Sequence, residues 1–127
     1  MFCRGIRGAI TVSANDKKSI LDATRMLLQE MVRANEVEPE SISAILFTTT
    51  PDLNAEFPAA ATREIGWTQQ MALICGHEMN VPGSLPRCVR ILMLVNTERK
   101  FEDISHIYLG EAKKLLVSKT PIPGGKS

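Results

Sequence analysis

Apolar residues alternate with polar ones, or form short unbroken runs, in five segments of the chain. Each segment is rich in residues that favour β-structure and ends near glycine, proline or charged residues. The strands predicted in this way are 2–12, 43–50, 71–75, 88–97 and 104–109. The run 88–95 is apolar on both faces, which is typical of a central strand that is covered on two sides.

Helical spacing of apolar residues predicts one long amphipathic helix after the first strand. Residues 13–16 offer an N-cap, and the periodic pattern continues to Asn35. The residues that recur at this spacing are Ile20, Thr24, Leu27, Leu28, Met31 and Val32. A second, short helix is predicted over 59–65, with Pro58 at its start and Gly66 just past its end.

The order strand, helix, strand predicts an α/β (α+β) fold, a mixed sheet with helices on one face. The chain has 127 residues, a length typical of one domain. We expect this domain over 1–117 and a flexible tail over 118–127. A domain of this size is small enough that a binding cleft can be shared between subunits.

Composition narrows the functional classes. The net charge is +1 with acidic and basic residues interspersed, which argues against a nucleic-acid surface. No apolar run approaches the ~20 residues that span a bilayer, and the N-terminus lacks the apolar core of a signal peptide, so we expect a cytoplasmic protein without membrane contact. The three cysteines show no CxxC spacing, so neither a disulfide framework nor a zinc ribbon is predicted.

The segment 75–90 contains the most unusual charged residue of the chain. Arg90 interrupts an apolar strand, where a guanidinium needs a carboxylate, a dense hydrogen-bond shell or an anionic ligand. Glu78 follows the preceding predicted strand, so the ends of the two strands can bring Glu78 and Arg90 together. A structural ion pair and a ligand site both remain open for this pair.

Two further polar residues interrupt apolar strands. Arg7 lies in the first strand, either on an exposed face or pointing into the same pocket as Arg90. Tyr108 lies in the last strand, where its ring packs in the core or its hydroxyl serves a ligand.

Several common chemistries do not fit these residues. Cys75, His77 and Glu78 lack the spacing of a zinc deaminase, and Cys75 and His77 are too close in sequence for a clean nucleophile–base pair. Glycine-rich phosphate-binding motifs are absent from the sequence. Arginines with one carboxylate instead suit a small polyanion, and a reaction that needs electrostatic stabilisation but no covalent intermediate.

With these residues identified, the sequence resembles the monofunctional, trimeric class of chorismate mutases with an α/β fold. The resemblance covers most of the chain without obvious insertions. The segments responsible are 4–9 with 11–12, 50–59 with 63–64, and 75–83 with 88–91 and 108–109.

The resemblance implies a homotrimer that packs its sheets into a barrel-like core, with active sites between neighbouring subunits. The implied reaction is the Claisen rearrangement of chorismate to prephenate in phenylalanine and tyrosine biosynthesis, with no cofactor or metal. It makes Arg90, Glu78 and Arg7 the catalytic residues. The implied substrate-binding residues are Arg7, Phe57, Arg63, Ile74, Cys75, Gly76, His77, Glu78, Arg90 and Tyr108.

Individual roles follow from the same resemblance. Arg90 would donate to the ether oxygen as its bond breaks and to a substrate carboxylate. Glu78, helped by the Cys75 position, would hold the ring hydroxyl, while Arg7 and Tyr108 fix the carboxylate-bearing end. A pericyclic rearrangement requires no nucleophile or general base, which agrees with the chemistry of these side chains.

The sequence also departs from the family pattern. Leu116 stands where the family usually has an arginine, and Ala60 where a basic residue is common. Lys113, Lys114 or Lys119 can substitute, and we expect affinity to suffer more than turnover. Two other functions stay open: a non-catalytic trimeric module that binds a small carboxylate, and a hydrolase or lyase that uses Cys75 or His77.

Overall fold

The computed structural model of the chain describes residues 1–67 and 71–115. In chain order, the strands and helices are β1 (Phe2–Thr11), α1 (Lys17–Asn35), β2 (Ile42–Thr49), α2 (Ala61–Ile65), β3 (Ala72–His77), β4 (Cys88–Thr97) and β5 (Ile107–Leu109). Short 3₁₀ turns accompany them at η1 (Pro39–Ser41), η2 (Pro58–Ala60), η3 (Phe101–Asp103) and η4 (Gly110–Leu115).

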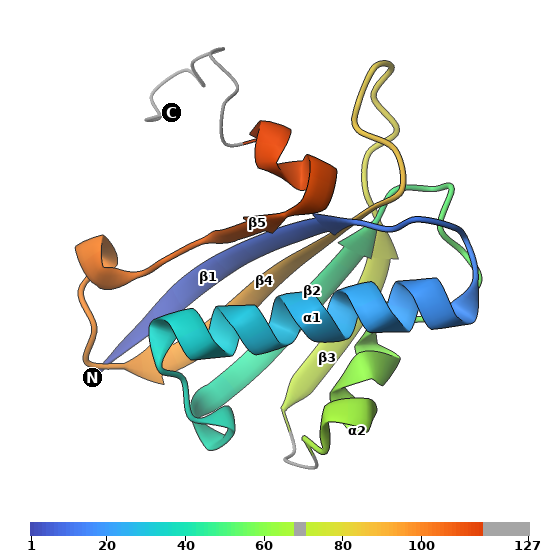
Figure 1. The fold of residues 1–127 in the computed structure, drawn as a ribbon. Coiled ribbons are helices and arrows are strands. Elements are labelled where there is room, and N and C mark those ends of the chain that lie inside the picture. Colours follow the sequence, from blue (N-terminus) through green and yellow to red (C-terminus); the bar gives the residue numbers. More distant parts are fainter. Residues whose placement is uncertain (68–70, 116–127) are drawn as a thin grey trace.

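The five strands form one sheet in the order β3-β2-β4-β1-β5. The central strand β4 is antiparallel to β1 and β2, whereas β5 is parallel to β1 and β3 is parallel to β2. Both helices lie on one side of this sheet, α1 across its middle and α2 beside the β3 edge (Figure 1). The predicted mixed sheet with helices on one face is therefore confirmed.

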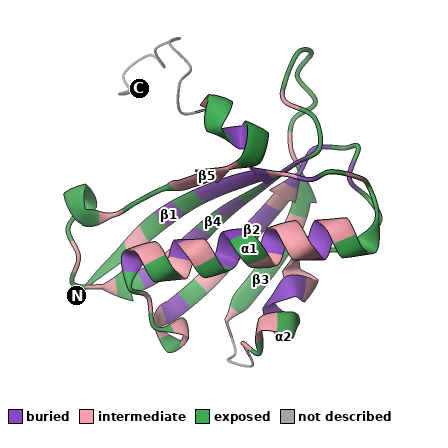
Figure 2. Ribbon diagram, viewed as in Figure 1, coloured by how far each residue is buried: buried purple, intermediate pink, exposed green. Residues whose placement is uncertain are grey.

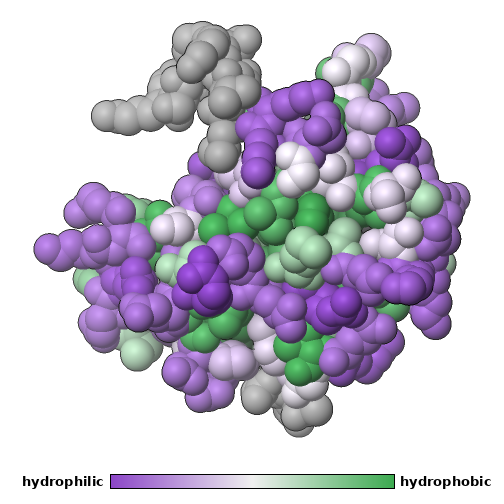
Figure 3. Space-filling model, in the orientation of Figure 1, coloured by the Kyte–Doolittle hydropathy of each residue, from purple (hydrophilic) through white to green (hydrophobic). Residues whose placement is uncertain are grey.

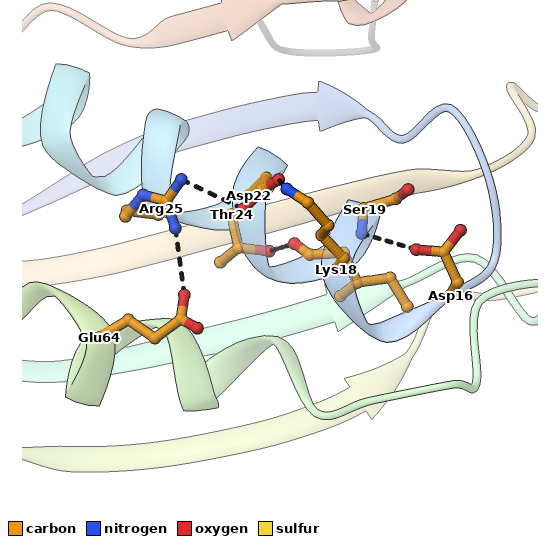
Figure 4. A network of polar contacts seen from close by, with 8 residues as sticks. Asp16, Lys18, Ser19, Asp22, Thr24, Arg25 and Glu64 are labelled. Atoms are coloured by element: carbon orange, nitrogen blue, oxygen red, sulfur yellow. Dashed lines mark hydrogen bonds and ion pairs between the residues drawn. The ribbon is translucent and has the colours of Figure 1, made fainter.

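Helix α1 has the predicted start and the predicted amphipathic character. The Asp16 side chain accepts a hydrogen bond from the Ser19 N–H at 2.8 Å, which caps the helix. Its charged side chains form ion pairs on the solvent side, and Arg25 joins α1 to Glu64 of α2 at 3.1 Å (Figure 4). Hydrophilic side chains occupy most of this helix-covered face of the molecule (Figure 3).

Gly8 of β1 shows which side of each strand faces α1. A Cβ on Gly8 would lie 2.5 Å from the Met31 sulfur and 3.1 Å from Leu27 Cδ1, so Gly8 packs directly beneath α1. Because successive residues of a strand point to opposite faces, Arg7 and Ala9 point away from the helices. The same alternation places Val89, Ile91 and the other core residues of β4 under α1, as the buried positions show (Figure 2).

The described residues of the chain leave most of the opposite face of the sheet open. The turn η4 covers only the part beside β5, where Ala9, Cys88 and Ala112 form a small buried cluster. Leu92 of β4 pairs with Leu46 of β2, and Leu46 pairs with Ile74 of β3, so the three side chains form one row. Leu92 is 37% exposed, Leu46 38% and Ile74 63%. The expectation that this strand is covered on two sides is therefore wrong for the single chain, and an apolar surface is left open.

Several predicted boundaries also differ from the structure. Strand β5 begins at Ile107, because the segment before it turns through η3 and is then held by hydrogen bonds to Asn35. The Asn35 side chain donates to the Ser105 carbonyl at 2.9 Å and accepts from the Ser105 N–H at 2.7 Å. Strand β3 extends to His77, and the helix predicted over 59–65 is divided into η2 and α2.

The predicted tail, 118–127, lies outside the described residues, as do Leu116 and Lys119. Within 1–67 and 71–115, no helix is both long enough and apolar enough to cross a membrane. The cytoplasmic location stays a prediction.

Candidate active site

Glu78 and Arg90 meet at the end of the sheet where β3 finishes and β4 begins. The Arg90 Nε and Glu78 Oε2 atoms are 3.9 Å apart, and their side chains are 45% and 31% exposed. The predicted meeting of these two residues is confirmed. Because both side chains remain partly open to solvent, each keeps hydrogen-bonding capacity for a ligand.

Two threonines of β2 hold Glu78 in place. The Thr48 hydroxyl donates to Glu78 Oε2, and the Glu78 backbone N–H donates to the Thr49 carbonyl at 2.7 Å. Thr48 pairs with Arg90 across β2 and β4, so the carboxylate and the guanidinium share one neighbour. A carboxylate fixed by a hydrogen bond from a hydroxyl is oriented before any ligand binds.

Arg7 and Tyr108 lie on the same face of the sheet as Arg90. Arg90 pairs with Ala9 of β1, and Ala9 pairs with Tyr108 of β5. Arg7 precedes Ala9 by two residues and therefore shares its face. Two strand spacings, about 10 Å, separate the Arg90 and Tyr108 backbones, which is the scale of a small metabolite. The sheet register thus places Arg7, Arg90 and Tyr108 on one face, and Glu78 joins them there through its contact with Arg90.

The other predicted site residues gather around the β3 edge. Phe57, 71% exposed, projects beside a hollow of about 400 Å³ that Arg63 of α2, Ile74 and Cys75 also line. A second hollow of about 370 Å³ shares Phe57 and Cys75 and adds Gly76 and His77. Among the described residues, neither hollow is lined by Arg7, Arg90 or Tyr108.

A nucleophilic role for Cys75 is not supported. Burial raises the pKa of the Cys75 thiol above its ordinary value, which disfavours the reactive thiolate. His77 Nδ1 lies 3.0 Å from the Thr49 hydroxyl, so this ring nitrogen is engaged by β2. Within the described part of the chain, no group of three or more His, Cys, Asp or Glu side chains could hold a metal ion.

Sequence reasoning missed two residues that hold predicted site residues. Thr48 has no distinguishing signal, because threonine is an ordinary strand residue. His106 Nδ1 accepts the Arg7 backbone N–H at 3.0 Å, next to the start of β5. Burial, and then the nearby Arg7 charge, lower the pKa of His106, so the neutral ring that accepts this bond is favoured.

Comparison with known proteins gives the family. The family described as chorismate mutase type I matches residues 3–117. The chain belongs to the type I chorismate mutase family.

Relatives and solved structures agree with this assignment. Chorismate mutase AroH of Bacillus subtilis (strain 168) is 41% identical over 109 residues, which cover 86% of each protein. Chorismate mutase AroH of Thermus thermophilus is 46% identical over 113 residues, covering 88% of this chain and 92% of that protein. A solved chorismate mutase from Clostridium thermocellum superposes with a TM-score of 0.85 at 49% identity, covering 87% of this chain and 98% of that one.

The expected family, the fold and the enzyme class are therefore confirmed. The chain is an isomerase of aromatic amino acid biosynthesis. The hydrolase or lyase alternative is excluded by this assignment.

Of the lysines expected to compensate for Leu116, Lys114 lies in η4 and pairs with Glu111 at 2.8 Å.

Proposed function

We propose that this chorismate mutase converts chorismate to prephenate over the uncovered face of the sheet, at the Glu78–Arg90 pair. The observation that supports this most strongly is the 3.9 Å approach of two partly exposed, opposite charges, on the sheet face that also carries Arg7 and Tyr108. A substrate that carries two carboxylates and a ring hydroxyl offers partners for all four side chains.

In the proposed mechanism the ether C–O bond breaks while the new C–C bond forms within one molecule. Negative charge then develops on the ether oxygen, and the Arg90 guanidinium donates a hydrogen bond to it. Glu78, already oriented by Thr48, accepts from the ring hydroxyl. Arg7 and Tyr108 bind the carboxylate-bearing end and hold the folded conformer in which the reacting carbons are close.

We further propose a homotrimer that builds each site from two chains. Two features support it: the uncovered apolar row of Leu46, Ile74 and Leu92, and the separation of the candidate residues into two groups. In a closed ring of three copies every interface joins two different surfaces of the chain. The site residues at the β3 edge, which include Phe57 and Arg63, would then meet Arg90 and the residues on its sheet face in the adjacent copy.

Product analysis tests the proposed reaction. Purified protein is incubated with chorismate and a chelator, and the products are separated and identified by mass and by acid conversion of prephenate to phenylpyruvate. We expect prephenate to form with saturation in chorismate. Binding of chorismate without turnover would instead favour the non-catalytic carboxylate-binding module.

A mixing experiment tests the shared site. Arg63→Ala and Arg90→Ala chains are unfolded and refolded separately and together, and their activities are compared. If each site uses Arg63 from one chain and Arg90 from another, mixed trimers regain some intact sites and exceed both parents. Activity of the mixture equal to the parents' average would show that one chain supplies both residues.

A further inference from the structure

Asp52 joins the end of β2 to the beginning of β4. Its carboxylate accepts the Arg87 backbone N–H, with Oδ2 at 3.0 Å and Oδ1 at 3.3 Å. The Thr50 hydroxyl donates to Asp52 Oδ1 and at the same time accepts the Cys88 N–H at 2.9 Å. These residues, Thr50, Asp52, Arg87 and Cys88, are called the Asp52 network below.

The backbone in this network is held from both sides. The Thr50 N–H donates to the Cys88 carbonyl at 3.0 Å, so Thr50 and Cys88 exchange two bonds. Arg87 has a φ of 47°, a left-handed conformation that is unfavourable for a residue with a side chain. Its carbonyl accepts the Val12 N–H at 2.7 Å, and its Nε donates to the Val12 carbonyl at 3.0 Å.

The network lies immediately next to the groups of the proposed reaction. Thr50 directly follows Thr49 and Thr48, which hold the Glu78 backbone and carboxylate. Cys88 is the first residue of β4 and lies two residues before Arg90. Movement between the ends of β2 and β4 would therefore change the spacing of Glu78 and Arg90.

We propose that Asp52 is a positioning residue of this chorismate mutase, which sets the distance between the Glu78 and Arg90 side chains through Thr50 and Arg87. The inference rests on the proposed roles of Glu78 and Arg90. Thr50 and Cys88 are buried, so a bond lost there is not readily replaced by water. Removing the carboxylate also takes away one of the restraints that hold Arg87 in its strained conformation.

The test compares Asp52→Ala, Asp52→Asn and wild type by steady-state kinetics, with thermal melts to establish folding. We expect kcat of Asp52→Ala to fall about 10- to 100-fold, because small misplacements of catalytic groups have effects of that size. Asp52→Asn keeps an acceptor for the Arg87 N–H and should recover most of kcat. Asp16→Ala is the matched control, since it also removes a carboxylate that accepts a backbone N–H, at the start of α1.

A second background separates positioning from loss of folding. The Arg90→Lys variant keeps the charge but has fewer hydrogen-bond donors, which are already imperfectly placed. In this background Asp52→Ala should lower kcat by a much smaller factor than it does in the wild-type enzyme. Equal losses in both backgrounds, or an unchanged kcat in folded Asp52→Ala, would overturn the inference. If Asp52→Ala does not fold, a comparison of Thr50→Val with Thr50→Ser decides the same question. We expect kcat to fall for the valine variant alone. Equal kcat values for the two variants would count against the inference.

The outcomes also separate this inference from the proposed function. An inactive wild-type enzyme would contradict the proposed function and remove the basis of the inference. An active wild type that depends on Arg90 but tolerates every Asp52 and Thr50 variant would contradict the inference alone.

Discussion

Thr48 and Arg90 lie directly opposite each other on β2 and β4, and the hydroxyl of Thr48 donates to the carboxylate that faces Arg90. The sheet register therefore sets the position of both charges. Thr48 itself is uncharged and need not contact the substrate to affect the reaction.

Replacing Thr48 by valine tests this arrangement. The change keeps the side-chain shape and removes the hydroxyl, so Glu78 loses a hydrogen bond to a charged group, commonly worth about 1.5–3 kcal/mol. We expect kcat/KM for chorismate to fall by about 10- to 100-fold, measured by steady-state kinetics. Thr24→Val removes a buried hydroxyl that donates to the Ile20 carbonyl at 2.7 Å, and it should change stability but not turnover. Equal kinetics for wild type and Thr48→Val would show that Glu78 needs no such support.

His106 predicts a pH dependence of stability. Its pKa is lowered in the folded protein, chiefly by burial, so the unfolded chain takes up this proton at higher pH than the folded one. The contribution of His106 is complete above the ordinary histidine pKa of about 6.5 and is lost as pH falls below that value. Protonation also removes the acceptor for the Arg7 N–H.

We therefore expect the Tm to fall between pH 7.5 and 5.5, with a smaller decrease in His106→Asn. The asparagine Oδ1 can accept the Arg7 N–H but does not titrate in this range. Melting curves at several pH values measure the difference. A His106→Asn profile parallel to that of wild type would assign the pH dependence to other groups.

The uncovered face predicts the effect of a charge on assembly. Leu46→Asp places a carboxylate in the apolar row, where burial against another copy would be costly. We expect sedimentation to show trimers for wild type and smaller species, with lower activity, for Leu46→Asp. Met26→Asp on exposed α1 is the control and should leave the trimer intact. A fully active monomeric wild type would contradict the shared site.

Most of the fold and the meeting of Glu78 with Arg90 could be predicted from the pattern of apolar residues. Arg90 is conspicuous because it interrupts an apolar strand, and Glu78 is the nearest acid at the end of the next one. The two-sided apolar pattern of β4 predicts cover on both faces of the strand, but the helices of the chain cover only one face (Figure 1). A single sequence does not distinguish a surface buried within a chain from one buried between copies.

The supporting residues could not be predicted for a different reason. Asp52 and Thr50 occupy a turn after β2, where such residues are common whatever their role. His106 contacts Arg7 only because η3 and Asn35 set where β5 begins. These relationships depend on tertiary contacts that no local pattern records.

The central claim is tested most directly by chorismate turnover of wild type, Arg90→Ala and Arg33→Ala, side by side. Arg33 pairs with Glu30 on exposed α1 and controls for the loss of an arginine. We expect Arg33→Ala to match wild type and Arg90→Ala to lose about 10²–10³-fold or more in kcat/KM, the scale of a lost transition-state donor. A folded Arg90→Ala enzyme that turns over chorismate like wild type would contradict the account.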